Sequence, residues 1–355
     1  MNRMPNRLVH SMAVFVLMLA AGSALAAGPA FVVERRVSIP QERFSEVHWA
    51  PAGGRLAART FRSVAIIDAT TGEADTFSIP AIEHVAWSPD GRWLALRSTP
   101  GARASGRARQ DRVHVVKAEK APRAERVRTV VDTALVRPEM RHPVAWKGDA
   151  LLSTLQDSVW VDRPVAPGAA PKAGLAAYWF APPGVPGSSE RVYVGVVGSD
   201  GRFETREIPP PPSTMHAPRI DPTRPISRGW RPIRMTPDGS RILTTAREAD
   251  GEIYMILGAD GSPQSRFTDG LGPTDLSTDG QWILAQAEVM GTRKLEGSEL
   301  FLVRAADGRA FALTGTGSVI ETDAAFEPGT LRIACIDQTD GAVLIGRIEG
   351  LPGGR

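Results

Sequence analysis

The chain has 355 residues, 42% of them hydrophobic and 23% charged. This composition is typical of a globular protein with a hydrophobic core and argues against a disordered chain. Lysine and arginine together number 42 against 39 aspartate and glutamate residues, which gives a formal net charge of +3. So small a basic excess argues against a general nucleic-acid-binding protein.

Residues 1–26 have the organisation of a secretory signal peptide. Arg3 and Arg7 form a positive start, residues 12–21 are uncharged and mostly apolar, and Ala-Leu-Ala at 24–26 is a small-x-small cleavage site. An uncleaved anchor is the alternative interpretation. No later stretch is long and apolar enough to cross a bilayer. We therefore expect a periplasmic or secreted protein, cleaved near Ala26 and without an integral membrane segment afterwards.

Cys335 is the only cysteine, so no internal disulfide is expected. It lies in the apolar run 331–336, which predicts a small buried residue of a strand. A reactive thiol would need exposure and a basic neighbour, and nothing local favours either.

One short pattern recurs along the chain. Trp-Ser-Pro-Asp-Gly at 87–91 precedes an apolar run, and related strings stand at 235–239 and 276–280. Weaker copies occupy 49–54, 146–149 and 326–329. In such a turn proline presets φ, aspartate caps the loop and glycine accepts a positive φ. A unit that returns at this spacing predicts a propeller or a solenoid.

The strands around each copy predict a four-stranded antiparallel blade. The segments 82–87, 93–97, 113–116 and 125–131 fit one such blade, and Asp-Gly turns mark second hairpins elsewhere. We expect an all-β protein consisting of a single β-propeller, residues 27–355, with six blades favoured and seven as the alternative. The double interval between 146 and 235 predicts an insertion or an extra degenerate blade at about 156–231.

The apolar segment 31–37 has no blade of its own, and the last repeat lacks an outer strand. Pairing 31–37 with 343–346 would close the ring and remove a sheet edge.

The repeated string resembles the TolB-type propeller repeat, also called the WD40-like or PD40 repeat, over about residues 30–350. The same repeat occurs in the periplasmic TolB protein and in the propellers of prolyl-oligopeptidase-like enzymes, so the resemblance implies a fold and leaves the function open. We find neither room for the α/β domain that precedes the TolB propeller nor a Gly-x-Ser-x-Gly nucleophile motif.

The propeller fold implies two unlike faces. The tight turns should share one face, and the loops between second and third strands, with the links between blades, should share the other. We expect the second face to carry the long segments and to bind ligands. Those segments are 99–112, 156–190, 209–231 and 288–298.

Two groups of residues are candidates for binding. The first is an arginine-rich loop that would contact an acidic partner or, alternatively, is simply solvated; it contains Arg103, Arg107, Arg109 and Arg112. The second should line the central funnel just before each inner strand, where channel hydration is the alternative; it contains Glu46, Glu83, Arg141, Arg231 and Asp323.

The sequence assigns no catalytic residue, metal site or cofactor. The histidines show no metal-ligand spacing, and Asp90, Asp238 and Asp279 are expected to cap turns. The leading hypothesis is an exported, non-enzymatic propeller that binds a protein or peptide through its loop-rich face in the cell envelope, with no nucleic-acid partner. The alternatives are a propeller enzyme, a hydrolase or lyase with its site in the funnel, and a structural component of an envelope or secretion assembly.

Overall fold

The computed structural model describes the chain from residue 28 to residue 351 with several gaps. The described ranges are 28–88, 90–98, 110–119, 127–134, 144–147, 150–153, 159–160, 175–180, 191–197, 203–208, 228–236, 240–248, 251–258, 260–267, 271–290, 295–315 and 319–351. Strands, turns and bends make up these ranges, and none of them contains a helix that could span a membrane. The expected signal peptide, 1–26, lies outside them.

Five sheets have four strands each, and their strands follow one another in sequence except in the last. The first two are β2 Glu46–Trp49, β3 Arg55–Arg59, β4 Ser63–Asp68, β5 Ala74–Ser78, and β6 Ile82–Trp87, β7 Trp93–Ser98, β8 Gln110–Lys117, β9 Val127–Ala134. The next two are β16 Arg228–Met235, β17 Arg241–Glu248, β18 Gly251–Gly258, β19 Pro263–Phe267, and β20 Gly272–Leu276, β21 Trp282–Met290, β22 Leu295–Arg304, β23 Ala310–Ala312. The last is β24 Glu321–Phe326, β25 Arg332–Asp337, β26 Ala342–Glu349 and β1 Ala30–Val37.

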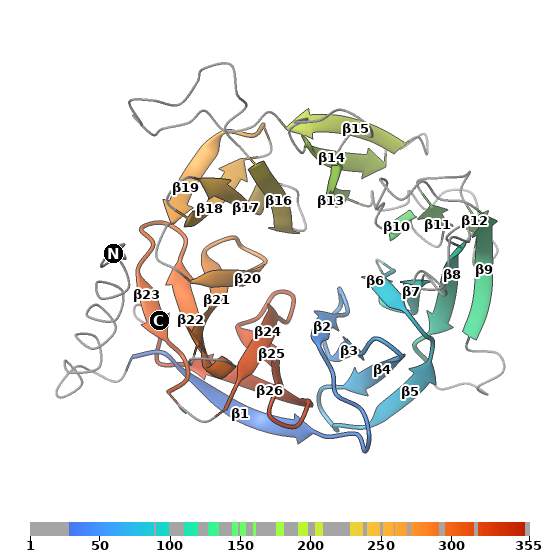
Figure 1. Cartoon of the computed structure of the whole chain (residues 1–355), viewed down its shortest axis with the longest axis horizontal. Helices are drawn as coiled ribbons and strands as arrows, with labels where there is room; N and C mark the ends of the chain where they lie inside the picture. The colour runs from blue at the N-terminus through green and yellow to red at the C-terminus, as the bar shows by residue number, and fades with distance from the viewer. Residues whose placement is uncertain are drawn as a thin grey trace, which may run out of the picture.

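Two further sheets have three strands each. They are β10 Val144–Lys147, β11 Ala150–Ser153, β12 Val159–Trp160, and β13 Leu175–Phe180, β14 Arg191–Val197, β15 Phe203–Ile208. The sheets stand in a ring, with the first strand of each on the inside (Figure 1). The fold is a single all-β propeller, as the repeat predicts.

The predicted number of four-stranded blades is wrong. The described strands form five such blades, where six were favoured and seven were the alternative. The count failed in the segment where the repeat is weakest: β10–β12 and β13–β15 each lack a fourth described strand. The expected insertion or degenerate blade at about 156–231 contains the β13–β15 sheet.

The N-terminal strand closes the ring. β1 pairs antiparallel with β26, from Ala30 opposite Glu349 to Val37 opposite Val343, and becomes the outer strand of the blade that begins with β24. The predicted closure is therefore confirmed. Because β1 covers the outer edge of β26, this blade presents no open edge there.

The repeated turns have the predicted chemistry. Asp279 Oδ1 accepts hydrogen bonds from Ser277 Oγ at 2.6 Å and from Gln281 N at 2.9 Å, while Ser277 Oγ accepts from Trp282 N at 2.9 Å. The equivalent bonds join Ser88, Asp90 and their neighbours. Gly280 has φ +66°, so glycine suits this position. Asp90 and Asp279 cap their turns as expected, and Asp238 lies outside the described residues.

The core lies between neighbouring blades rather than inside one. Trp49 and Leu56 of the β2–β5 blade pack against Ala325 and Ile345 of the closing blade. Cys335 is fully buried in the next cluster, between the closing blade and the β20–β23 blade, as the sequence predicted. The β2–β5 blade, the β20–β23 blade and the closing blade each contribute to two such clusters and are therefore covered on both faces, which explains why their strands are buried along much of their length.

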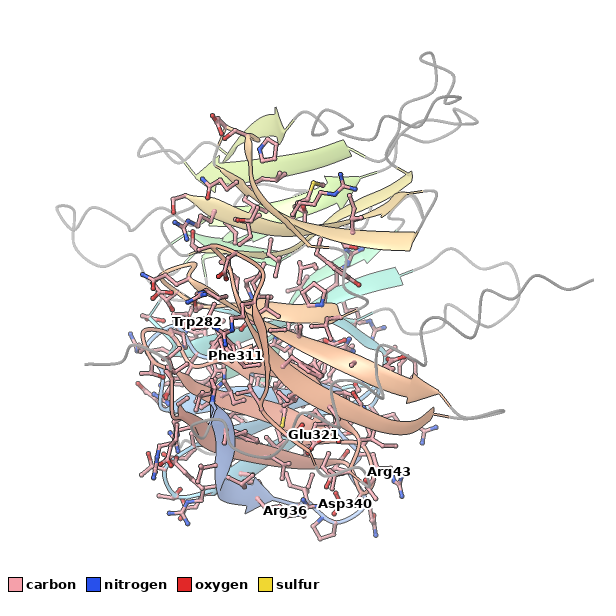
Figure 2. The ribbon with its side chains drawn as sticks, turned by 90° about the vertical axis from the view of Figure 1, so that its left-hand side faces the viewer. Arg36, Arg43, Trp282, Phe311, Glu321 and Asp340 are labelled. Atoms are coloured by element: carbon pink, nitrogen blue, oxygen red, sulfur yellow. The ribbon has the colours of Figure 1, made fainter. Side chains whose placement is uncertain are left out.

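The disc has two faces that the strand directions define. On the face we call the bottom face, Pro-Asp-Gly-type turns such as 277–281 join first to second strands; on the top face, inner strands begin and second strands end. Figure 2 views the disc from its side: Trp282 and Phe311, with ring centroids 6.4 Å apart, lie toward the bottom face on the left, and Arg43 and Asp340 lie toward the top face on the right.

Two details of the top face differ from expectation. The segment 288–298 is mostly an extended hairpin, because β21 runs to Met290 and β22 starts at Leu295. Arg112, expected in a loop, lies in β8, where its Cα pairs with Ser98. This strand begins at Gln110, three residues before the segment 113–116 that predicted it.

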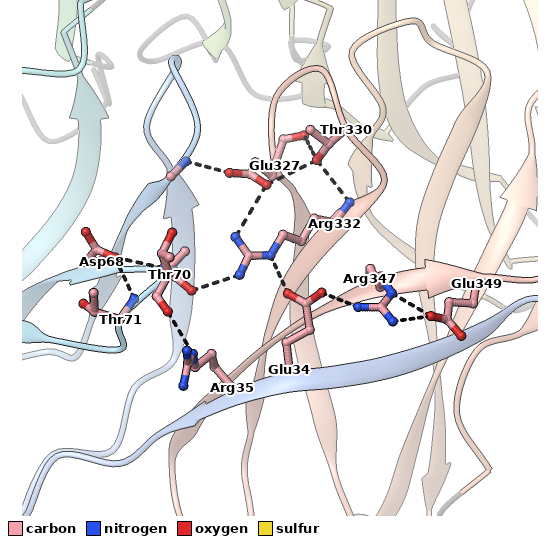
Figure 3. Close-up of polar contacts among 12 residues, drawn as sticks. Glu34, Arg35, Asp68, Thr70, Thr71, Glu327, Thr330, Arg332, Arg347 and Glu349 are labelled. Carbon is pink, nitrogen blue, oxygen red and sulfur yellow. Dashed lines mark hydrogen bonds and ion pairs between the residues drawn. The ribbon is translucent and has the colours of Figure 1, made fainter.

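A cluster of charged residues holds the closing strand at its register shift between Val33 and Arg35 (Figure 3). Glu34 of β1 accepts hydrogen bonds from Arg332 Nε and Arg347 Nη1, both at 2.9 Å. Arg332 Nη2 also donates to Ala69 O at 2.9 Å, which joins the closing blade to the β2–β5 blade. Burial acts to raise the pKa of Glu34, but the bonds from Arg347 and Arg332 outweigh it and hold that pKa below its ordinary value.

Candidate functional site

Side chains of the inner strands bind the backbone of the neighbouring inner strand. Trp87 Nε1 donates to His48 O at 2.9 Å, and Trp49 Nε1 donates to Ala325 O at 3.0 Å. The repeated tryptophan of the motif therefore joins β6 to β2 and β2 to β24. These bonds hold the inner strands in fixed positions relative to one another, so the side chains that these strands carry keep a fixed geometry.

Asp275 extends these contacts between inner strands to β16. Its side chain is almost fully buried; Oδ1 accepts from Arg234 Nε at 2.5 Å and from Leu276 N at 2.8 Å. Its Oδ2 accepts from Phe326 N at 2.7 Å. One carboxylate thus ties together β16, β20 and β24.

Asp323 lies at an irregularity of β24. The ladder with β25 shifts register between Thr322 and Ala325, and Asp323 has φ +50°, a conformation that aspartate tolerates better than most residues. Its Oδ2 accepts from Val47 N at 2.5 Å, and its backbone N donates to Gln286 Oε1 at 3.3 Å. The carboxyl group that projects from this bulge is directed toward β2.

Glu46 and His48 stand on β2 beside this carboxyl group. Arg59 Nε donates to Glu46 Oε2 at 2.6 Å, Arg59 Nη2 also contacts Glu46 Oε1, and His48 Nε2 lies 3.3 Å from Glu46 Oε2. Val47, which binds Asp323, is between them in sequence. The three titratable side chains therefore gather where β2 meets β24.

The two carboxyl groups have opposite pKa shifts. Burial raises the pKa of Asp323 to about 6 and is reinforced by the charge of Glu46, against the opposing effects of His48, the Val47 amide and Arg234. Burial also acts to raise the pKa of Glu46, but hydrogen bonds from His48 and Arg59 outweigh it and hold that pKa at about 2. Carboxyl groups whose pKa values are pushed apart in this way are typical of functional sites.

Replacing Asp323 by asparagine should stabilise the protein above pH 6. The folded-state pKa is raised from 3.8 to about 6, so the wild type loses stability as the pH rises from about 4 to 6, and the asparagine variant does not. A shift of this size corresponds to roughly 2–3 kcal/mol. Thermal unfolding of both proteins at pH 4 and pH 7.5 checks this.

The control is Glu46→Gln, for which the sign is reversed. The lowered pKa of Glu46 contributes stability that is present above about pH 4.5 and is lost as the pH falls toward 2, so glutamine should destabilise at pH 7.5. Equal signs for the two variants at pH 7.5 would contradict the assigned shifts.

A cavity of about 700 Å³ opens beside Asp323. Its polar lining residues come from the starts of β20 and β24, the second half of β21 and the position after β25, which places it at the top face. They include Thr274, Gln286, Glu288, Thr322, Asp323 and Gln338. Its volume lies within the range of about 300–1,000 Å³ that is usual for ligand pockets.

Phe61 is the most exposed large apolar side chain of the described residues, with 66% of its surface accessible. It occupies the tight turn between β3 and β4, and its backbone is held in place: Ala81 N donates to Phe61 O at 2.7 Å and Ile79 N donates to Arg62 O at 3.0 Å. Ser45, which lines the cavity, donates its N–H to Arg59 O two residues before Phe61. Phe61 and the cavity therefore share the top face.

The structure brings together some of the predicted site residues. Glu46 and Asp323 meet at the junction of β2 and β24, and Asp323 lines the cavity. Glu83 and Arg231 belong to the inner strands β6 and β16, but their side chains lie outside the described part of the chain. Arg103, Arg107, Arg109 and Arg141 are outside it altogether, and Arg112 belongs to β8 rather than to a loop.

Sequence reasoning missed His48, Phe61, Gln286 and Asp275. Asp275 stands directly before the motif string at 276–280, so the sequence could have predicted its place at the end of an inner strand. The exposure of Phe61 was not, because an isolated phenylalanine in a short turn gives no periodic signal.

Comparisons with known proteins agree with the fold. No family model matches the chain, and the search of curated proteins gives no match. Among solved structures, a chain of a mitotic checkpoint complex is similar, with a TM-score of 0.50, 12% identity, and coverage of 89% of this chain and 91% of that one. The Cps50 (Swd1) beta-propeller domain of Myceliophteria thermophila has a TM-score of 0.49, 13% identity, and coverage of 89% and 98%. At 12% identity the likeness to the checkpoint-complex chain concerns the fold alone.

Proposed function

We propose that this chain is an exported TolB-type propeller that binds a protein or peptide partner through its top face. The observation that carries the proposal is the combination, on one face, of the cavity at Asp323 and the rigidly held, exposed Phe61. Pockets and exposed aromatic side chains on one face are both features of recognition surfaces.

The backbone bonds to the link 79–81 strengthen this proposal. A side chain on a fixed turn loses little conformational entropy when a partner covers it, so its apolar surface contributes to affinity. Phenylalanine offers a large area for that purpose. Val33, the other exposed large apolar side chain of the described residues, lies instead on the closing strand β1.

Export belongs to the same proposal. The segment 1–26 supports it by its two arginines, its apolar run and its small-x-small site. We place the mature protein in the periplasm or outside the cell, where its partner would be an envelope or secreted protein. The intact mass of the protein recovered outside the cytoplasm would correspond to cleavage near Ala26.

Site-specific photo-crosslinking in the producing cell tests the proposal. A photoreactive phenylalanine analogue at position 61 should give a discrete crosslinked partner, and the same analogue at position 33 should not. Position 33 is the matched control because it is also exposed and apolar. Identical crosslinks from both positions, or none from position 61, would overturn the proposal.

A propeller enzyme is the second candidate, favoured by one observation. His48 and Glu46 form a pair at 3.3 Å beside Asp323, whose pKa of about 6 suits proton transfer near neutral pH. A hydrolase or lyase acting at the channel would lose its turnover in Asp323→Asn and His48→Gln while it still binds substrate. Partner binding by the wild type without any turnover would favour the binding function.

A further inference from the structure

The lining of the top-face cavity is acidic and polar. It contains the carboxyl groups of Asp323 and Glu288, the amides of Gln286 and Gln338, and threonine hydroxyls, but no lysine or arginine side chain. The Gln286 amide is already bonded within the lining, since its Oε1 accepts from Asp323 N and its Nε2 donates to Glu288 Oε1 at 3.5 Å. The carboxylates are acceptors that also carry negative charge. The cavity therefore offers acceptors and negative charge to whatever enters it.

The nearby cations already have carboxylate partners of their own. Arg234 donates to the buried Asp275 at 2.5 Å, and Arg59 donates to Glu46 at 2.6 Å. Arg234 and His48 act on Asp323 through space, and Glu46 acts in the opposite sense. No arginine bonds directly to Asp323 among the described contacts, so its charge remains available to a ligand.

The carboxyl group of Asp323 is also fixed in direction. The N–H of Val47 binds its Oδ2, and the bulge between Thr322 and Ala325 sets the backbone from which it projects. Its Oδ1 forms no hydrogen bond among the described contacts. A preorganised acceptor at a cavity wall binds a donor without a further cost of ordering its side chain.

We propose that this cavity receives a lysine or arginine side chain of the partner peptide, held by Asp323 and Glu288. The proposal rests on the proposed function and names the ligand chemistry of that surface. Ile233, Pro273 and Ile320 supply the apolar part of the lining, against which the methylene stem of a long basic side chain packs. None of the lining residues is aromatic, so the cavity is not a cation–π cage for methylated amines.

Selection from a random heptapeptide display library on the immobilised, folded mature protein tests the proposal. Peptides enriched on the wild type should carry lysine or arginine at one fixed position, and synthetic versions with norleucine there should bind at least about tenfold more weakly. Asp323→Asn should abolish the preference, since asparagine keeps the acceptor for Val47 and tolerates positive φ but removes the charge. Glu288→Gln, at an exposed position, should weaken the same peptides without any effect on folding.

The control is Glu73→Gln in the turn between β4 and β5, on the opposite face, which should leave binding unchanged. Affinity of the wild type for the basic peptide should also fall as the pH drops below about 6, where Asp323 gains a proton, and Asp323→Asn should show a flatter profile. Enriched peptides that need Phe61 but show no basic preference would overturn this inference alone. The absence of any enriched peptide would count against the binding function as well.

Discussion

Gly346→Ala is expected to weaken the pairing of the closing strand β1 with β26 and so to destabilise the closed ring. A Cβ atom at position 346 would lie 2.1 Å from Val32 O and 2.7 Å from the ring of Phe31, both in the closing strand β1. Backbone cannot yield to such a contact as a flexible side chain can, so β1 must move away from β26 and weaken its hydrogen bonds. We expect a loss of about 3 kcal/mol in the free energy of unfolding, or roughly 5–10 °C in Tm.

Gly315→Ala is the matched control, since a Cβ atom at position 315 would meet nothing within 4 Å. Its Tm should stay close to that of the wild type. Calorimetry of the three proteins measures the difference, and increased hydrogen exchange in 30–37 of the Gly346→Ala variant would locate it. Equal melting temperatures for both alanine variants would show that β1 does not stabilise the closed ring.

Asp275→Ala is expected to be as damaging, for an electrostatic reason. The substitution leaves the guanidinium of Arg234 and the N–H of Phe326 without their acceptor at a site where Asp275 itself is 3% exposed. The Arg234 side chain is itself partly exposed, so the cost comes mainly from the lost buried acceptor. Such a loss costs about 1–3 kcal/mol, and more where a charged group is bonded to the acceptor, so we expect about 3 kcal/mol here. Three inner strands lose their common contact, so unfolding in denaturant should occur at a clearly lower midpoint.

The control for this prediction is Asp307→Ala. Asp307 also pairs with an arginine, Arg304, but at a solvent-exposed turn, where water and salt screen the charges. Its denaturation midpoint should barely change. A midpoint for Asp275→Ala as high as that for Asp307→Ala would mean that the contacts of Asp275 among the inner strands contribute little to stability.

The repeat in the sequence predicts the fold because turn chemistry is local. Pro-Asp-Gly strings fix their own conformation through neighbouring side chains, and the apolar runs after them form strands whatever the rest of the chain does. The same reasoning found the closing strand, since an apolar segment without a partner needs one. It failed in the number of four-stranded blades, where the segment from 144 to 208 holds only one weak copy of the repeated string, at 146–149.

The candidate site was only partly predictable because its geometry is not local. Glu46 and Asp323 were chosen as residues that precede inner strands, yet their contact depends on a bulge 277 residues away from Glu46 in sequence. Hydrogen bonds from His48 and Arg59 lower the pKa of Glu46, and burial raises that of Asp323, and a spacing pattern reveals none of these. The arginine-rich loop, which sequence reasoning favoured, lies outside the described residues except for Arg112.

The central claim is that recognition takes place on the top face. Hydrogen exchange of the mature protein with and without the partner captured at position 61 tests it most directly. We predict slower exchange at 41–45, 60–63 and 319–323 in the complex, and unchanged exchange at the bottom-face turns 50–54 and 277–281. Protection confined to those bottom-face turns would contradict the account.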